Sequence, residues 1–190
     1  RYISVVHGCE IHEHYLGSSC LLQHFSNSKT LQFLKDLSRQ LPPLVNIDTT
    51  LVLTRATLEN KMSTVALAEH LAEICAAMAV QHWEYGTLGG RVLTAMLHRQ
   101  TPNTFTESMM LLQDTLSETF IQCCQQNCAV FNEMIVNSRD YQYNIMGIRT
   151  LQRSYLLKKS GILVERPQYM LMRVAVALHQ NDLAQVHHQD

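Results

Sequence analysis

Apolar residues recur at helical spacing through the middle of this 190-residue chain, and that periodicity constrains its fold more than any other feature. One series runs through an alanine-rich stretch, which favours helix, at Leu67, Leu71, Ile74, Cys75 and Met78. A second series follows at Leu88, Val92, Leu93, Met96 and Leu97. Pro102 ends this second series because proline cannot continue a helix. The pattern predicts a mainly α-helical fold.

Capping residues and prolines suggest where the other helices begin and end. Ser28 is predicted to cap a helix over residues 30–39, which Pro42 and Pro43 stop. Asp48 is predicted to cap the next helix, and Ser63 or Thr64 the one after it. The apolar positions expected on the Asp48 helix are Leu51, Leu53, Ala56 and Leu58. Thr104 or Thr106 is expected to open one long helical stretch that reaches Val136.

Both ends of the chain carry hairpin patterns. Alternation around Gly8, with Ile3, Val5 and Ile11, predicts an N-terminal β-hairpin. Near the other end, a short helix is expected from residue 141, and Gly161 is predicted to turn the chain into a return strand over residues 162–164. Pro167 suits the first turn of a final helix over residues 168–179. The polar tail from residue 181 is expected to fray.

The bulk composition narrows the class of protein. The net charge is −1, which gives no electrostatic reason to expect binding to nucleic acid or to an anionic membrane. No apolar run reaches the ~18 residues that a membrane helix needs, and no signal peptide is recognisable. Charged residues make up 16% of the chain, which is low for a globular domain and suggests that a partner, or a missing remainder of the same chain, covers part of the surface. Because no signal peptide is recognisable, a cytoplasmic location is expected.

The six cysteines, Cys9, Cys20, Cys75, Cys123, Cys124 and Cys128, are irregularly spaced. The chain is too long for a disulfide-stapled miniature domain, so reduced thiols are expected. The group from Cys123 to Cys128 lacks a C-x-x-C pair, which favours buried thiols on a helix over a metal site. His12 and His14 share one face of the predicted N-terminal strand, which allows weak adventitious metal binding, although an exposed hairpin is the preferred interpretation.

The block over residues 139–182 carries two dense motifs in order. The first, from Tyr143 to Leu157, follows Y-N-x-x-G-x-x-T-L-x-x-S-Y-L-L, and the second, from Glu165 to Val176, begins E-R-P-Q and continues with M-L-M-R-V. The block resembles the run ahead of the catalytic barrel in the large (alpha) subunit of class I ribonucleotide reductases. This resemblance implies reduction of ribonucleoside diphosphates to deoxyribonucleotides for DNA replication. It also implies a small radical-generating subunit and further large subunits as partners.

Earlier segments resemble the ATP-cone of the same family, an allosteric module of a β-hairpin and four helices. The segments MSTVAL at residues 62–67, HWEYGTLGGR at 82–91 and LHRQT at 97–101 match V-T-T-V-E-L, H-P-D-Y-A-x-L-A-A-R and L-H-K-x-T. The resemblance implies a cone-like module over residues 1–101 and a helical segment over residues 102–190. The expected fold is then an N-terminal hairpin with helices, followed by helices with a second small hairpin.

The predicted nucleotide site departs from the cone pattern at its cations. The family's Lys-Arg pair falls on Val5 and Val6, and of the hairpin motif only Gly8 matches. Elsewhere, Thr64 and the basic Arg99 match. A buried triphosphate without cations is costly, so Gly8, Thr64 and Arg99 are predicted to form at most a vestigial allosteric site. This site would bind ATP or dATP weakly, unless substitutes such as His7, His12 and Lys29 serve instead.

Catalytic residues of the family lie outside the matched motifs. None of the six cysteines stands at a position matching the radical or redox cysteines, so no catalytic, cofactor or metal residue is predicted here. Glu165 and Arg166 are read as positional: Glu165 near the start of the final helix, where a carboxylate is favoured, and Arg166 and Arg173 paired with neighbouring carboxylates. The expected identity is the N-terminal part of a reductase large subunit, viral or otherwise diverged, without dATP feedback. The alternative is an inactive truncated homologue that acts as a protein-interaction module.

Overall fold

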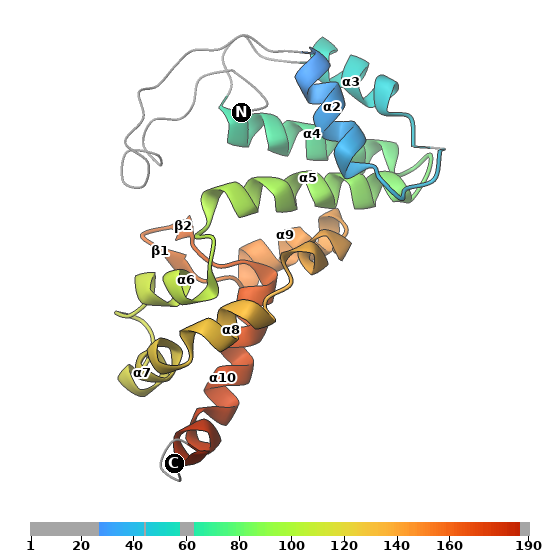
Figure 1. Cartoon of the computed structure of the whole chain (residues 1–190). Helices are drawn as coiled ribbons and strands as arrows, with labels where there is room; N and C mark the ends of the chain where they lie inside the picture. The colour runs from blue at the N-terminus through green and yellow to red at the C-terminus, as the bar shows by residue number, and fades with distance from the viewer. Residues whose placement is uncertain (1–26, 44, 58–62, 187–190) are drawn as a thin grey trace. The chain divides into compact units, whose positions relative to one another are not determined.

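The computed structural model describes residues 27–43, 45–57 and 63–186, and its elements are almost all helical (Figure 1). In chain order they are α2 (Asn27–Leu37), α3 (Ile47–Ala56), α4 (Thr64–Met78), α5 (Glu84–Gln100), α6 (Phe105–Leu111), α7 (Glu118–Gln126), α8 (Cys128–Met134), η1 (Asn137–Gln142), α9 (Ile145–Ser154), β1 (Lys158–Lys159), β2 (Ile162–Leu163) and α10 (Pro167–Val186). The mainly α class and the second small hairpin are confirmed. The predicted N-terminal hairpin falls outside the described residues.

The chain packs as two compact units. Unit 1 comprises residues 1–96 together with residues 143–146, and unit 2 comprises residues 97–142 and 147–190. Each unit therefore contains two separate stretches of sequence, and the division falls inside α5 and α9. The predicted modules, 1–101 and 102–190, were defined by family resemblance and not by packing, so that division remains a prediction.

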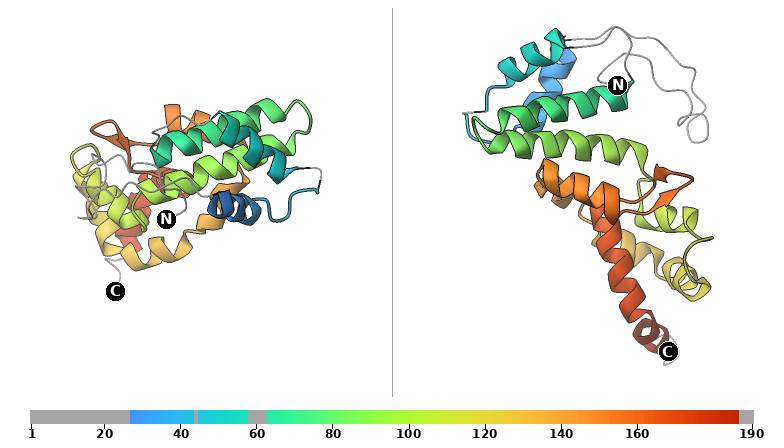
Figure 2. Two further views of the ribbon diagram at one scale, coloured as in Figure 1. Left: turned by 90° about the horizontal axis from the view of Figure 1, so that it is seen from above. Right: turned by 180° about the vertical axis from the view of Figure 1, so that it is seen from behind.

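The core of unit 1 forms where α2, α4 and α5 bring their apolar faces together, and both views of Figure 2 show α4 and α5 side by side. Four of the predicted positions on α4, Leu67, Leu71, Cys75 and Met78, are buried, and Ile74 packs against them half-buried. Burying one such leucine contributes roughly 1.5–3 kcal/mol. The helical periodicity therefore identified this core correctly.

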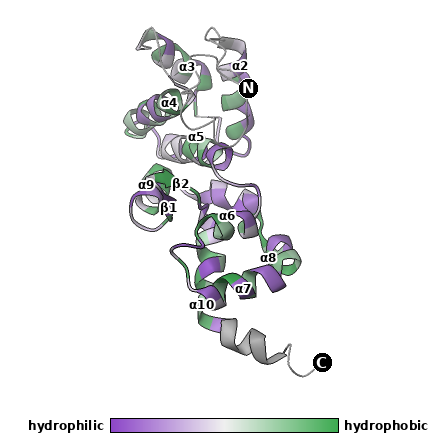
Figure 3. Cartoon of the chain, turned by 90° about the vertical axis from the view of Figure 1, so that its left-hand side faces the viewer, coloured by the Kyte–Doolittle hydropathy of each residue, from purple (hydrophilic) through white to green (hydrophobic). Residues whose placement is uncertain are grey.

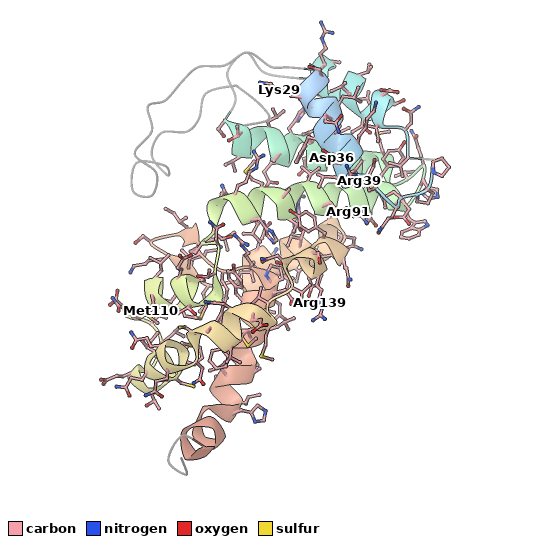
Figure 4. All side chains as sticks on the ribbon, viewed as in Figure 1. Lys29, Asp36, Arg39, Arg91, Met110 and Arg139 are labelled. Atoms are coloured by element: carbon pink, nitrogen blue, oxygen red, sulfur yellow. The ribbon has the colours of Figure 1, made fainter. Side chains whose placement is uncertain are left out.

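Arg91 of α5 closes the end of α2 inside unit 1 (Figure 4). Its Nη1 donates hydrogen bonds to the carbonyl oxygens of Leu37 and Arg39, at 2.6 and 2.8 Å. The last carbonyls of a helix have no intrahelical donors, so a guanidinium at this point satisfies them and complements the helix dipole. Gln40 follows with a φ of 70°, and α2 has thus ended before Pro42 and Pro43 are reached.

The helix starts agree with the sequence at some sites and differ at others. Ser63 caps α4 by accepting a hydrogen bond from the Ala66 amide, as predicted. The prediction that Ser28 caps the first of these helices is wrong, because α2 already begins at Asn27. The prediction that Asp48 caps α3 is also wrong, because Asn46 accepts from the Thr49 amide at 2.9 Å and Asp48 lies within the first turn.

Replacement of Asn46 by alanine is expected to cost about 1 kcal/mol of stability, the usual loss for a side-chain cap. Replacement of Asp48 by alanine removes only a helix-dipole interaction and is expected to cost about 0.5 kcal/mol or less. Urea denaturation followed by circular dichroism would measure both variants. Equal losses, or a larger loss for the Asp48 variant, would contradict the assignment of Asn46 as the cap.

The buried face of α3 is polar, which corrects the sequence-based expectation. Thr50 and Thr54 are completely buried, whereas the predicted core residue Leu53 is exposed, as is Ala56. Each threonine hydroxyl donates to the carbonyl oxygen four residues earlier, Thr50 to Asn46 and Thr54 to Thr50. Both buried hydroxyls are thereby satisfied by backbone carbonyls of their own helix, and the Thr50 hydroxyl also lies 3.5 Å from the Met78 sulfur.

In unit 2, the stretch after Pro102 is divided into three short helices and is not one long helix. Thr104 opens α6 with a capping box that involves Glu107. Ser117 caps α7, and Asn127 separates α7 from α8. The apolar series is nearly continuous through Met109, Phe120 and Phe131, because all three helices bury residues in the same core.

The second hairpin forms as predicted, with Gly161 in its turn at a φ of +83°. Lys158 pairs with Leu163, and Lys159 pairs with Ile162. Pro167 is the first residue of α10, as expected. The expectation that this helix stops near residue 179 is wrong, because α10 continues through the polar residues to Val186.

Candidate functional site

The three predicted nucleotide-site residues fall in different parts of the chain. Thr64 is the half-buried first residue of α4 in unit 1, and Arg99 is an exposed residue near the end of α5 in unit 2. Gly8 lies outside the described residues. Beside Thr64, the Ser63 hydroxyl is already engaged by its own helix. The vestigial nucleotide site therefore remains a prediction.

The polar groups that the structure does bring together lie in unit 2, around the E-R-P-Q motif. Glu165 is completely buried just before α10. Its Oε1 accepts from Arg173 Nε at 2.7 Å, and its Oε2 accepts from Arg173 Nη2 at 3.2 Å and from the Leu157 amide at 2.9 Å. A two-pronged arginine–carboxylate pair with a third donor satisfies the buried charge. Glu165 therefore joins the chain before the hairpin to the first turns of α10.

Arg166, the next residue, is 4% exposed and has a separate set of partners. Its Nη2 donates to the carbonyl oxygens of His98 and Thr101, at 3.0 and 3.3 Å, and its Nε donates to the Thr101 hydroxyl at 2.8 Å. Nη1 reaches the side-chain oxygen of Asn137 at 3.1 Å. The planar guanidinium thus caps the C-terminal end of α5, where the helix dipole is negative.

Asp140 is the third buried charge of the network. One carboxylate oxygen contacts His98 Nε2 at 2.8 Å, and the other accepts from the Gln168 amide in the first turn of α10 at 3.0 Å. The Tyr141 ring stands edge-on to the His98 ring, with the two centroids 5.2 Å apart. A carboxylate at a helix N-terminus is favourable, so Asp140 holds the start of α10 against η1.

Two hydroxyl groups complete the attachment of α10. Ser108 donates to the Val164 carbonyl at 2.6 Å, and Tyr169 donates to the Pro102 carbonyl at 3.2 Å. Burial raises the pKa of Tyr169 to about 12, so the phenol stays protonated and keeps donating across the physiological range. The Arg166 guanidinium lies 5.2 Å from the centroid of the Tyr169 ring.

This arrangement has a structural character, because its charged side chains form hydrogen bonds and ion pairs with other groups of the same protein. The predicted positional role of Glu165 and Arg166 fits these contacts, and the pairing of Arg173 with a carboxylate is confirmed. Two details differ. Among the described residues, Arg166 donates to carbonyl, hydroxyl and side-chain amide oxygens and to no carboxylate, and the carboxylate that accepts from the first turn of α10 belongs to Asp140. We name Glu165, Arg166, Arg173, Asp140 and His98 the motif network.

Sequence reasoning missed the roles of Asp140 and His98. Both stand in motifs that resemble the family, R-D at residues 139–140 and L-H-R at residues 97–99. Nothing in either motif alone indicates that the two side chains meet, because 42 residues separate them. The only sequence feature that could have drawn attention to Asp140 and His98 is that each stands in a motif resembling the family.

The cysteines of the described residues are free thiols in different environments. Cys75, Cys123 and Cys124 are buried, and Cys128 is exposed at the start of α8. Burial raises the pKa of Cys75 and that of Cys124 to about 12. Within the described part of the chain, no three histidine, cysteine or acidic side chains are grouped to hold a metal ion. The histidines at residues 7, 12 and 14 lie outside it.

Alkylation by iodoacetamide at pH 8 is expected to modify Cys128 at least about a thousandfold faster than Cys75 and Cys124, because the reactive species is an accessible thiolate. A raised pKa makes the thiolate scarce at this pH, and burial hides the sulfur. Peptide mass spectrometry of timed samples would give each rate, with the urea-unfolded chain as the control. Comparable rates for the three thiols in the folded protein would show that the helices open readily.

Among the helices that the structure describes, none combines the length and apolar character needed to cross a membrane. The apolar positions of α10 are interrupted by polar ones, as Figure 3 shows in colour.

Comparison with known proteins matches a region that contains Glu165, Arg166 and Arg173 of the motif network. The family described as "Ribonucleotide reductase, all-alpha domain" matches residues 141–189. The ribonucleoside-diphosphate reductase large subunit of Arabidopsis thaliana is 37% identical over 136 residues, covering 66% of this chain and 17% of that protein. Large chain 2 from Saccharomyces cerevisiae is 36% identical, with 66% and 16% covered, and the Variola virus large subunit is 37% identical, with 65% and 18% covered.

The chain thus spans about 17% of the length of the curated relatives that it matches. The family match covers α9, the hairpin and α10, and it contains Glu165, Arg166 and Arg173 of the motif network, whereas Asp140 and His98 lie before it. Plant, yeast and viral relatives are similar to the chain at nearly the same level. Over the part that these comparisons match, the chain belongs to the N-terminal region of ribonucleoside-diphosphate reductase large subunits.

Proposed function

We propose that this chain is the structural support on which the remainder of a reductase large subunit rests, and that the complete subunit converts ribonucleoside diphosphates to deoxyribonucleotides. The carrying observation is an exposed apolar face on α10. Leu171, Val174 and Leu178 are 49%, 47% and 73% exposed, at spacings of three and four residues along one side of the helix. We call this set the α10 face.

The motif network fixes the position of the start of α10, and therefore the orientation of the α10 face within unit 2. Asp140 and Glu165 hold the first turns of α10 through buried, charge-assisted hydrogen bonds, and Arg166 attaches the same segment to α5. Contiguous exposed apolar surface on a fixed helix is typical of a site that another protein segment covers. The remaining length of the relatives supplies such a segment, since the chain corresponds to only 17% of the Arabidopsis subunit.

A chimeric enzyme tests this proposal. Residues 1–190 would replace the matching region of the Arabidopsis large subunit, and deoxyribonucleotide formation would be measured with the corresponding small subunit. We expect an active chimera, and we expect Leu178→Glu in the α10 face to abolish most of its activity. The control is Val80→Glu, which changes an apolar residue of unit 1 that is even more exposed, at 93% against 73% for Leu178. A folded but inactive chimera, or equal activity of the two variants, would overturn the proposal.

The alternative function, an inactive homologue that binds a reductase as a separate protein, uses the same α10 face. It predicts that the isolated chain inhibits an intact relative when added in excess, because it would compete for the covered surface. The structural-support proposal predicts no inhibition, since that surface is already occupied within the relative. Titration of the chain into the active Arabidopsis enzyme distinguishes the two.

We also propose that the chain has lost tight nucleotide regulation, including inhibition by dATP. The support is the sequence at the predicted hairpin, where Val5 and Val6 stand in place of the two cations of the resembling pattern. Calorimetric titration of the folded chain with ATP and dATP is expected to show dissociation constants weaker than about 100 μM, or no heat. Micromolar binding would contradict this part of the proposal.

A cytoplasmic location and partnership with a small subunit belong to the same proposal. The free thiols of Cys75, Cys123, Cys124 and Cys128 are in line with a reducing compartment. The small subunit follows from the family's two-subunit organisation, and the chimera assay requires it.

A further inference from the structure

Residues 143–145, at the junction of η1 and α9, pack directly on the middle of α5 within unit 1. A Cβ atom added at Gly90 would overlap the Tyr143 carbonyl oxygen and lie 2.6 Å from the Asn144 carbonyl carbon. A Cβ atom added at Gly89 would lie 3.3 Å from Ile145 Cδ1. Ile145 is 5% exposed, so its side chain is buried where this segment meets α5. We call residues 143–145 the strap.

Gly89 is also approached closely from α4. The same added Cβ atom would lie 3.0 Å from Cys75 Cβ and 3.3 Å from the Ala72 carbonyl oxygen. These contacts are tight, so a side chain at position 89 would require α4 or the strap to move. The strap and α4 therefore both depend on the absence of a side chain at this turn of α5.

The part of α5 that the strap contacts is intrinsically a poor helix. Its sequence places Gly86, Gly89 and Gly90 within five positions. Glycine is the least favourable helix residue after proline, because the helix restricts a backbone that is otherwise unusually free. Nevertheless, α5 runs without a break from Glu84 to Gln100. Tertiary packing must therefore supply the stability that the local sequence lacks.

The residue from which the chain approaches the strap is itself held in place. Asp140 lies three residues before the strap and is completely buried. Its carboxylate accepts from the Gln168 amide at 3.0 Å and contacts His98 Nε2 at 2.8 Å. A short connection to a fixed residue limits the conformations that a segment can explore. Seating the strap on α5 therefore costs less conformational entropy than ordering a free segment would.

We propose that the strap locks a joint in α5. While residues 143–145 are seated, α5 is one continuous helix, and when they leave, α5 opens at its glycines. The amides of residues 90–94 donate to the carbonyls of residues 86–90 in an α-helix, so these are the hydrogen bonds that open. Any contact that displaces the strap would therefore interrupt α5. This inference does not rest on the proposed function, because the lock lies within unit 1 and is measured without any activity.

Amide hydrogen exchange of the full chain, resolved by residue with NMR spectroscopy, tests the lock. Ile145→Ala shortens the buried side chain of the strap and leaves the sequence of α5 unchanged. We expect the amides of residues 90–94 to exchange at least about tenfold faster in this variant, and those of α4 to change by less than about threefold. Ile145→Val should give a smaller change in the same direction, and it serves if the alanine variant does not fold.

The matched control for local opening is Leu67→Ala. It truncates a completely buried side chain of α4 in the same unit and leaves the strap unaltered. We expect it to accelerate exchange in α4 at least as much as in residues 90–94, because it weakens the core of unit 1 as a whole. Circular dichroism melts establish that every variant is folded.

Two glycine substitutions give the test opposite signs. Gly90→Ala raises the helix propensity of α5 but blocks the strap, so exchange of residues 90–94 should accelerate, whereas a helix without a lock would exchange about fourfold more slowly. At Gly86 an added Cβ would meet nothing within 4 Å, so Gly86→Ala strengthens the helix and leaves the strap seated. Combined with Ile145→Ala, it should slow the accelerated exchange by about fourfold.

Three results would overturn the proposal. The amides of residues 90–94 could keep their original rates in both strap variants. Ile145→Ala could accelerate α4 and α5 equally, which would make the strap an ordinary part of the core of unit 1. Gly90→Ala could slow the exchange of residues 90–94, which would show that the continuity of α5 does not depend on the strap.

Discussion

Replacement of Arg166 by leucine is expected to lower the free energy of unfolding of unit 2 by about 4 kcal/mol, among the larger effects of a single substitution. The guanidinium donates to the carbonyls of His98 and Thr101, the Thr101 hydroxyl and the Asn137 side chain. Leucine fills part of the space but leaves these buried acceptors without donors, and each orphaned group costs about 1–3 kcal/mol. Urea denaturation would measure the loss.

Two companion variants show whether the loss comes from the geometry of the guanidinium or from its charge. Arg166→Lys keeps the charge but offers a single ammonium group, which cannot reach all the acceptors at the end of α5 and on η1, so it should lose more than half of the same stability. Arg139→Ala removes an exposed arginine of unit 2 and should change stability by about 0.5 kcal/mol or less. Full stability in the lysine variant would show that only charge matters at this site.

Replacement of Gly90 by alanine is expected to destabilise unit 1 by about 3 kcal/mol, because overpacking against backbone cannot be relieved by a rotamer change. A Cβ at this position would overlap the Tyr143 carbonyl oxygen and would lie 2.6 Å from the Asn144 carbonyl carbon. The resembling family pattern has alanine here, so the close approach is a property of this chain's own packing. Measurement of the Cys75 alkylation rate would report the loss, since this buried thiol lies in unit 1.

Gly86 in the same helix provides the matched control. A Cβ there would meet nothing within 4 Å, so Gly86→Ala should stabilise α5 by about 0.5–1 kcal/mol through its better helix propensity. The two substitutions are chemically identical and are expected to shift stability in opposite directions. Equal effects at the two positions would show that residues 143–144 do not pack closely on Gly90.

Local sequence patterns predicted the features that depend on local interactions. Ser63 and Thr104 were recognisable as caps because a hydroxyl one position before a helix satisfies amides of its own first turn. Gly161 was recognisable because a turn with positive φ favours glycine. The core of α4 followed from periodicity, since its buried positions recur with the period of the helix.

Features that depend on distant partners were not predictable in this way. On α3, Thr50 and Thr54 are buried because the helix turns its polar side to Met78 and its neighbours, and no local pattern indicates that choice. The breaks between α6, α7 and α8 could not be predicted from the apolar pattern, because all three helices bury residues in the same core. The pairing of His98 with Asp140 required the fold itself.

The discontinuous composition of the two units has a consequence for synthesis on the ribosome. Unit 1 includes residues 143–146, and the contacts of Gly90 with Tyr143 and Asn144 cannot form until those residues leave the exit tunnel. By then residues 97–142 have already emerged, but Arg166, which satisfies the end of α5, has not. Neither unit can therefore be completed in the order of translation, and we expect the nascent chain to reach its stable form late, in one concerted step.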